Sequence, residues 1–292
     1  MSILASAQPS NKCPTEQLET VNVTAPSRAW GLTCPCVAWL WFRVAKTTKK
    51  KPAASRKPKK VVPELRASIR PLRWVMKWVF RAGLAVVALV LLAVLFYSVV
   101  NPPTTPYIMS EARRLDGVDR VWVPIEEVSP FMARSVVAAE DANFCNHWGF
   151  DMAAIRAALN EGSGRGASTI SQQVVKNAYL WQGRSWTRKA LEALMTPLVE
   201  AFWSKRRILE VYLNVAEFDE GVFGVEAAAR HYFGVGPENL SALQAARLAA
   251  ILPDPKGRSA SKPSAQVRRR TKAIISGAAT IRADGRAACF EH

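Results

Sequence analysis

The chain has 292 residues, of which 49% are hydrophobic, and carries a formal net charge of +17 at pH 7. This length allows one or two domains, and the hydrophobic content is enough for a packed core, so a wholly disordered chain is excluded. A charge so far from neutral implies an anionic partner: a nucleic acid, a membrane surface or a phosphorylated substrate. The positions of the basic residues along the chain distinguish among these.

A basic, proline-rich arm precedes the most apolar part of the chain. Lysines and arginines are dense between Arg43 and Arg81, where Glu64 is the only acid. This composition predicts an unstructured segment. The earlier residues, 1–42, indicate no function, and Met76 is an alternative translation start.

The stretch Ala82–Val100 contains no charge and no proline. At ~1.5 Å per residue, a helix of this length crosses a hydrocarbon core of ~30 Å. Trp74, Trp78 and Arg81 precede it and Tyr97 lies near its end, as is typical of residues at membrane interfaces. We therefore predict a transmembrane helix rather than a buried core helix. The absence of a small-x-small cleavage site after it predicts that it remains as an anchor.

The basic residues lie overwhelmingly before the span, which predicts a cytoplasmic N-terminus and an outward-facing remainder. Anionic lipid head groups are then the nearest partner of the arm, and we expect no specific nucleic acid. Four parts follow in order: a basic arm (1–78), the transmembrane helix (79–100), an outer domain (101–265) and a basic tail (266–292). In the tail, the cluster from Arg268 to Lys272 predicts a solvated helix.

The outer domain is predicted to be all-α, because no run of alternating β-branched residues is bounded by turn signals. Ser129 and Pro130 indicate a helix that runs to about Glu140. Asp151 caps a helix that stops at Gly162, and Ser241 caps another that ends at Pro253.

The first chemical motif begins where the first of these helices ends. Glu140 follows the small apolar residues Val136-Val-Ala-Ala139 and precedes Asp141. Burial beside such residues raises a carboxyl pKa toward the range useful for proton transfer. The alternative is a solvated pair of acids at a helix end.

The second motif is Gly166–Asn177, where a glycine-containing loop enters a helix with Ser168 as its expected cap. Gln172 and Lys176 are four residues apart, as are Gln173 and Asn177, so they project from one side of the helix. Such a face suits polar sugar and phosphate groups, aided by the positive end of the helix. An ordinary polar helix face explains the pattern equally well.

The third motif places Arg188 four residues and Lys189 three residues before Glu192, on one helix. One interpretation is a surface salt bridge worth a few tenths of a kcal/mol, roughly. The other is a diphosphate clamp, because cations beside a departing pyrophosphate neutralise its developing charge.

Five ordered stretches together resemble the peptidoglycan glycosyltransferase family, and most closely its monofunctional biosynthetic transglycosylases. The resemblance covers roughly residues 110 to 255 and is carried by Glu140–Gly149, Gly166–Asn177, Arg188–Glu192, Lys205–Asn214 and Gly221–Gly234. It implies a lysozyme-like, all-α domain anchored by one N-terminal transmembrane helix. It also implies an inner-membrane protein with a periplasmic catalytic domain.

The resemblance further implies an inverting transfer that joins lipid II units into β-1,4-linked glycan strands and releases undecaprenyl pyrophosphate. Glu140 would be the general base that takes the proton of the acceptor's 4-hydroxyl group. Lys176, Arg188 and Lys189 would hold the pyrophosphate. Glu192 would be a second catalytic acid near the leaving group or near a divalent cation, Mg²⁺ or Mn²⁺.

Other residues of these motifs are expected to support or bind substrate. Asp141, Phe144 and His147 would position Glu140 and line the donor cleft. The remaining candidates for substrate binding are Ser168, Thr169, Gln172, Gln173 and Asn177. Glu210, Tyr212 and Asn214 are expected to be structural, whereas Trp122, Phe131 and Arg134 are expected to contact lipid.

The implied partners are lipid II, the lipid-linked glycan strand, membrane lipids and other cell-wall synthesis or division proteins. No transpeptidase activity is expected, because too little chain follows Ser259-Ala-Ser-Lys262 and a Lys-Thr-Gly element is absent. A lytic enzyme of lysozyme-like fold and a non-catalytic basic membrane scaffold remain as alternatives. A disulfide between Cys145 and Cys289 also stays open.

Overall fold

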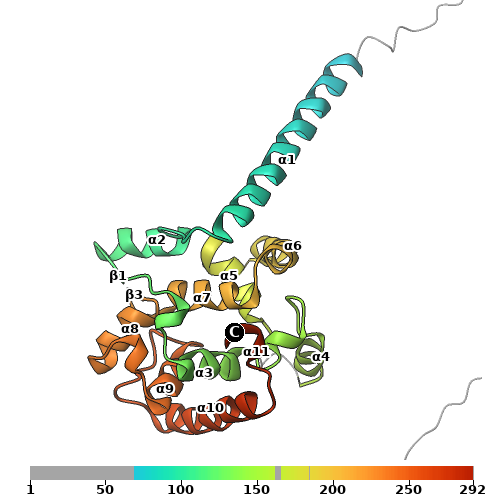
Figure 1. The fold of residues 1–292 in the computed structure, drawn as a ribbon. Coiled ribbons are helices and arrows are strands. Elements are labelled where there is room, and N and C mark those ends of the chain that lie inside the picture. The colour runs from blue at the N-terminus through green and yellow to red at the C-terminus, as the bar shows by residue number, and fades with distance from the viewer. Residues whose placement is uncertain (1–68, 162–165, 184, 292) are drawn as a thin grey trace, which may run out of the picture. The chain divides into compact units, whose positions relative to one another are not determined.

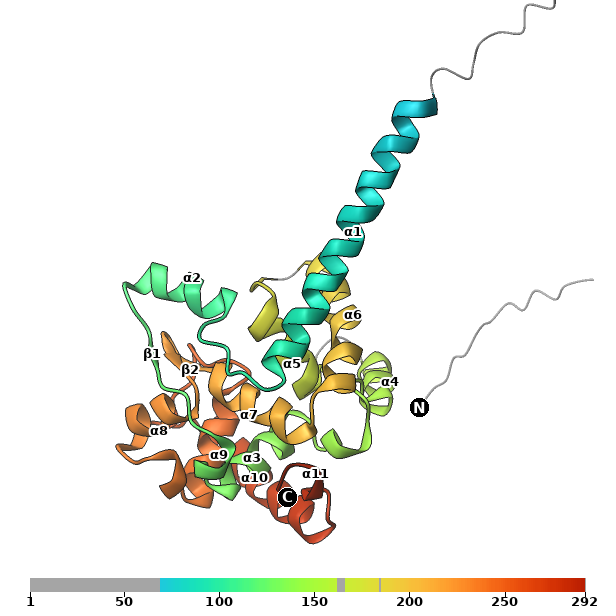
Figure 2. The ribbon, with the colours of Figure 1, turned by 45° about the horizontal axis from the view of Figure 1, so that its top comes forward.

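The computed structural model describes residues 69–161, 166–183 and 185–291. Residues 1–68, which make up most of the predicted basic arm, lie outside this description. Met76, the alternative start, lies within the described residues. Figures 1 and 2 show the helices, whose bounds are α1 Ile69–Tyr97, α2 Pro106–Leu115, α3 Pro130–Glu140, α4 Met152–Glu161, α5 Ile170–Tyr179, α6 Trp186–Phe202, α7 Lys205–Val215, α8 Val225–Phe233, α9 Ala242–Ile251, α10 Ala265–Ala283 and α11 Ala288–Glu291. The predicted all-α domain is confirmed.

A small sheet accompanies these helices and was not predicted. Its strands are β1 Asp119–Arg120, β2 Glu217–Asp219 and β3 Val222–Phe223. The order is β1-β3-β2, with β1 parallel and β2 antiparallel to β3. Strands of two or three residues are too short to produce an alternating pattern, so the sequence gives no signal for them.

Helix α1 is apolar and largely exposed along its length, and the stretch Leu72–Tyr97 is long enough to cross a membrane. It supplies the predicted membrane anchor, although the helix begins at Ile69, before the predicted span. Only its end contacts the domain. Trp203 donates its indole N–H to Val94 O at 2.8 Å, and Arg207 donates to Tyr97 O at 3.1 Å.

Helix α7 runs through the core of the domain, and most of its residues from Ile208 to Val215 are buried. Leu209, Val211 and Leu213 are fully buried. The amide of Asn214 holds the chain at Val123, accepting from its N–H and donating to its carbonyl, both at 2.8 Å. This supports the expected structural role of Asn214.

The predicted helix starts agree with the structure, with one displacement. Asp151 Oδ1 accepts from Ala154 N at 2.9 Å at the start of α4, and Ser241 forms a capping box at the start of α9. Helix α5, however, is capped by Thr169 rather than by Ser168.

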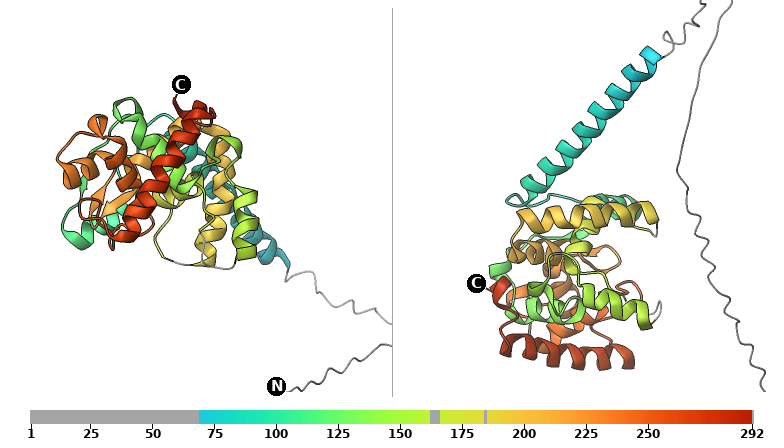
Figure 3. Two further views of the ribbon diagram at one scale, coloured as in Figure 1. Left: turned by 90° about the horizontal axis from the view of Figure 1, so that it is seen from below. Right: turned by 90° about the vertical axis from the view of Figure 1, so that its right-hand side faces the viewer.

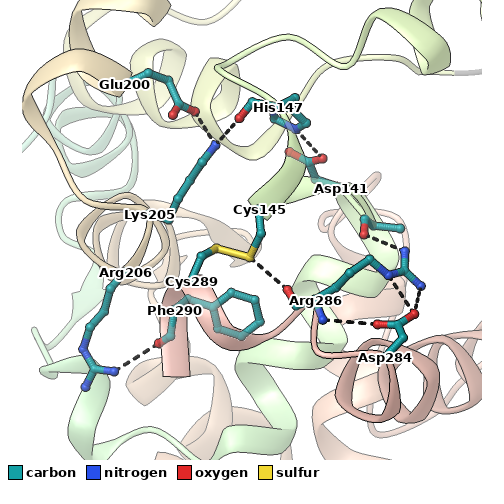
Figure 4. Close-up of a disulfide and its surroundings, with 11 residues drawn as sticks. Asp141, Cys145, His147, Glu200, Lys205, Arg206, Asp284, Arg286, Cys289 and Phe290 are labelled. Atoms are coloured by element: carbon teal, nitrogen blue, oxygen red, sulfur yellow. Dashed lines mark hydrogen bonds and ion pairs between the residues drawn. A yellow bond between two sulfur atoms is a disulfide. The ribbon is translucent and has the colours of Figure 1, made fainter. Parts of the chain in front are cut away.

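The C-terminal segment is part of the domain, which differs from the expected solvated helix. Helix α10 lies along one side of the domain (Figure 3) and packs against α3 and α9. Val267, Ile274 and Ile281 are buried on one face of this helix. A disulfide joins Cys145 to Cys289, which lies in α11 (Figure 4). This buried face is hard to recognise in the sequence, because its residues are seven apart and the arginines at 268–270 follow the first of them.

Candidate active site

Glu140 is the last residue of α3, and its side chain is largely enclosed, with 13% exposed. Its Oε2 accepts from Gln173 Nε2 at 3.0 Å, and its Oε1 lies 3.3 Å from Arg270 Nη2. Burial raises the pKa of Glu140, against the hydrogen bond from Gln173 and the charges of Arg270 and Lys176. A carboxyl group in this setting suits proton transfer, as predicted from the apolar residues before it.

Lys176 lies one turn after Gln173 on α5 and is mostly buried. Burial lowers its pKa, and the nearby carboxylates of Glu192 and Glu140 oppose that effect. The ammonium group is therefore close enough to both acids to feel their charge. It also lines a cavity of ≈ 330 Å³, together with Gln173, Asn177, Tyr212 and Lys256 among others.

A second cavity, of ≈ 250 Å³, adjoins the carboxyl group of Glu140. Asp141, Ser168 and Thr169 are among the other residues that line it. The hydrogen-bonded pair Glu140 and Gln173 thus has one member in the lining of each cavity. A base in this position is adjacent to two spaces large enough for polar ligand groups.

The cations of the third motif surround Glu192 on α6. Arg188 Nη1 lies 2.7 Å from Glu192 Oε2, and Lys189 pairs with Oε1. Glu192 is 2% exposed, so the interpretation as an ordinary surface salt bridge is wrong. Lys189 Nζ also donates to Ser168 Oγ at 3.2 Å, which brings the second and third motifs together.

The donor set does not fit a divalent cation held by this chain alone. Both oxygens of Glu192 are paired with cations, and Lys176 adds a third positive charge beside them. Among the described residues, no three His, Cys, Asp or Glu side chains gather in a metal-binding group. Divalent cations in proteins prefer several oxygen ligands. We derive no step through a metal.

Asp141 connects Glu140 to the start of α5. Its Oδ2 accepts from Ile170 N at 3.0 Å, and its Oδ1 lies 2.8 Å from His147 Nε2 (Figure 4). Asp141 is 6% exposed, so these bonds form inside the protein. Asp141 and His147 thus have the geometry of residues that position Glu140 relative to Gln173 and Lys176.

Three predicted substrate-binding residues are buried, and their binding of substrate stays a prediction. Phe144 is fully buried beneath Lys205, whose Nζ lies 4.5 Å from the ring centroid, so its ring does not line a cleft. Thr169 and Gln172 form the capping box of α5 and are buried. Thr169 Oγ1 and Gln172 Oε1 are therefore bonded to the backbone, while Thr169 also lies in the lining of the smaller cavity.

Asn177 lies further along the larger cavity, where its Oδ1 accepts from Gln182 Nε2 at 3.1 Å. Two residues of the site were missed by sequence reasoning. Tyr212 donates its hydroxyl to Gln173 Oε1 at 3.3 Å, and Arg270 contacts Glu140. The one available signal for Arg270 was the apolar spacing from Val267 to Ile274, which indicates a packed face on its helix.

Comparison with known proteins supports the same grouping of motifs. A family model described as transglycosylase matches residues 108–279, more than half of the chain. The chain belongs to this family. The matched region continues past residue 265 into α10, consistent with the packing of that helix.

Three relatives, each named biosynthetic peptidoglycan transglycosylase, illustrate the similarity. The protein of Jannaschia sp. (strain CCS1) is 56% identical over 236 residues, covering 81% of this chain and 98% of its own. That of Rhodospirillum centenum is 50% identical over 72% of this chain and 92% of its own. That of Caulobacter vibrioides is 48% identical over 70% of this chain and 92% of its own.

Proposed function

We propose that this chain polymerises lipid II by an inverting transfer in which Glu140 is the general base. The chain is a peptidoglycan glycosyltransferase of cell wall synthesis, by its family and its relatives. One buried carboxyl group carries the proposal about Glu140: it lies in the lining of one cavity and accepts from Gln173, which lines another.

The acceptor's 4-hydroxyl oxygen attacks the anomeric carbon of the donor sugar while Glu140 takes the hydroxyl proton. The bond from that carbon to the pyrophosphate oxygen breaks, and its electron pair leaves with the pyrophosphate. Attack from the opposite face converts an α-linked donor into a β-1,4 bond. The donor is the growing lipid-linked strand, and the acceptor is lipid II.

Lys176, Arg188 and Lys189 stabilise the departing pyrophosphate in this proposal. Fixed cations lower the barrier most when they already surround the place where negative charge develops. The buried carboxylate of Glu192 holds Arg188 and Lys189 in that place before substrate arrives. Its role is therefore to position the cations at the leaving group.

The membrane anchor supports a site close to a membrane surface, and the basic arm favours a cytoplasmic N-terminus and a periplasmic domain. Exposed apolar residues follow one face of α6 beside the end of α1, at Leu191, Leu194 and Phe202. We propose that this face contacts lipid, since large exposed apolar patches mark membrane or partner contacts.

The earlier lipid-contact assignment of Phe131 and Arg134 has no such support. Both lie on α3; Arg134 pairs with Glu291, and Phe131 lines an apolar cavity between α3, α9 and α10. The lining of this cavity includes no residue of α1 or α6. Trp122 remains close to the anchor, because Arg207 lies 5.5 Å from its ring centroid and bonds Tyr97 O.

The test supplies the full-length protein in detergent with lipid II and measures glycan polymer. We expect polymer from the wild type and a decrease of roughly 10²- to 10⁴-fold for Glu140→Gln. Glu127→Gln, at an exposed acid, is the matched control and should behave as wild type. Wild-type activity of Glu140→Gln would contradict the proposal. Release of fragments from finished peptidoglycan, without polymer, would favour a lytic enzyme.

A further inference from the structure

The C-terminal helix α10 brings a guanidinium group to the carboxyl group of Glu140. Arg270 Nη2 lies 3.3 Å from Glu140 Oε1 and donates to the neighbouring Ala139 O at 3.1 Å. The other carboxyl oxygen accepts from Gln173 Nε2 at 3.0 Å. The carboxylate is therefore held from two sides, by α10 and by α5.

In this position Arg270 leaves one of its own N–H groups without a hydrogen-bond partner among the described residues. The unpartnered group is its Nε, which is buried. A buried N–H without a partner costs free energy, and a guanidinium at a protein surface avoids that cost by facing water. The position of Arg270 is better explained by its contact with the carboxyl group of Glu140.

The packing of α10 fixes Arg270 relative to α3, the helix that carries Glu140. A Cβ added at Gly277 would lie 3.3 Å from Ala138 Cβ, so this glycine permits a close approach of the two helices. Beyond α10, Arg286 Nη1 donates to Ala142 O at 2.9 Å, and the disulfide holds Cys289 at Cys145. The chain on both sides of Glu140 is thus tied to the C-terminal segment.

We propose that Arg270 is a positioning residue for Glu140, which holds the carboxylate in a fixed orientation between α10 and α5 so that its free lone pair faces the acceptor. The proposal rests on the assignment of Glu140 as the base. It makes the C-terminal segment part of the site rather than an appended tail.

The pH dependence follows from the groups that surround Glu140. They are Arg270 on α10, Gln173 and Lys176 on α5, Tyr212 on α7 and the adjoining Asp141. Burial raises the pKa of Glu140, and of the two cations Arg270 opposes this more than Lys176 does. Loss of Arg270 raises the pKa further. Because the base works ionised, its activity would then be lost at a higher pH as the solution is acidified.

The experiment compares the full-length wild type with Arg270→Met and Arg270→Lys in lipid II polymerisation. For Arg270→Met we expect kcat to fall about ten- to a hundredfold at neutral pH. We also expect a KM within about twofold of wild type, because in this proposal Arg270 acts through Glu140. The acidic limb of the kcat profile should move up by about one pH unit. Arg270→Lys keeps the charge and should recover part of the rate.

Arg269→Met is the matched control, because Arg269 is an exposed neighbour on the same helix. It should leave the rate and the pH profile unchanged. An acidic limb that does not move in Arg270→Met, or an equal effect in Arg269→Met, would overturn the proposal. If Arg270→Met fails to fold, Arg270→Lys must still show the smaller shift in the same direction, and an unshifted limb there would also overturn it.

Glu140→Gln separates this inference from the proposed function. An active Glu140→Gln removes Glu140 as the base and the positioning role with it. An inactive Glu140→Gln together with an unshifted Arg270→Met retains the base and rejects only the role of Arg270.

Discussion

Two buried acids of the site have different partners, and the difference separates their roles. Glu140 is held by one neutral amide and one guanidinium, and burial raises its pKa. Glu192 is held by two cations, Arg188 and Lys189. A carboxyl group with weak partners can exchange a proton, whereas one enclosed by cations serves to place them.

Lys176 is influenced by the charges of both acids and offers a direct test of the clamp. Lys176→Met removes the buried ammonium while keeping most of the side-chain volume. We expect kcat to decrease by roughly 10²-fold, because one fixed charge at the leaving group is lost. The measurement is steady-state polymerisation of lipid II, with Lys262→Met at an exposed lysine as the control. A higher KM with unchanged kcat would show that Lys176 binds ground state and transition state equally.

At the scale of single residues, the sequence identified the charged residues of the site, but not which residues of the motifs are buried. Arg188, Lys189 and Glu192 were found from their spacing on one helix, Lys176 from its place on a polar helix face, and Glu140 from the apolar residues before it. The family resemblance supplied their roles. Phe144 and Thr169 were assigned to the substrate, and both are buried. A motif records which residues a site needs, but not which of them reach its surface.

The start of α5 is the element on which the site depends most. Asp141 accepts from Ile170 N, and the Thr169 capping box satisfies the following N–H groups. Thr169 Oγ1 also donates to Gly149 O at 2.7 Å, which ties the helix start to the loop of the first motif. These bonds set the direction in which Gln173 and Lys176 leave the helix.

Two capping boxes in the domain form a matched pair for this idea. Thr169→Ala and Ser241→Ala should each lower the free energy of unfolding by about 1 kcal/mol, from loss of the cap. Thr169→Ala should lose more, since it also breaks the bond to Gly149. Only Thr169→Ala should lower kcat, because α9 carries no residue of the clamp. Denaturant unfolding and polymerisation rates measure both, and an equal loss of kcat in Ser241→Ala would contradict this account.

Helix starts were legible in the sequence because capping residues act locally. The start at Ser241 and the end of α3 at Glu140 were predicted correctly. The cap of α5 was displaced by one residue, since Ser168 and Thr169 are adjacent and chemically alike. The packing of α10 and the bond between Cys145 and Cys289 depend on chain folding over long separations, which no local pattern records.

At the scale of the whole molecule, the anchor and the domain are joined by a small set of directed contacts. Arg207 donates to Val100 O at 2.9 Å, and Arg120 donates to Pro102 O at 2.9 Å. These bonds satisfy carbonyl groups that follow the end of α1. The apolar face of α6 lies on the same side of the domain. The sequence predicted the anchor from its length, but α6 gave no such signal, because its apolar residues equally suit a core face.

Leu194 and Phe131 provide a matched test of which surface contacts lipid. Both side chains are exposed, Leu194 at 70% on α6 and Phe131 at 44% on α3. We expect Leu194→Asp to reduce polymerisation in lipid vesicles by about tenfold relative to detergent, since a buried charge at the membrane surface is unfavourable. Phe131→Asp should show the same ratio as wild type. The opposite ranking would restore the assignment of Phe131 to the membrane.

The acidic limb of the rate profile reports most directly on Glu140, the buried base on which the whole account depends. Polymerisation of lipid II by the full-length enzyme, measured as kcat/KM against pH, gives the apparent pKa of the essential base in the free enzyme. Because burial raises this pKa, activity should be lost as the pH falls through a value above the ordinary 4.5 of a glutamate. The residual activity of Glu140→Gln should lack that limb. A limb at the ordinary value in the wild type, or the same limb in Glu140→Gln, would contradict the account.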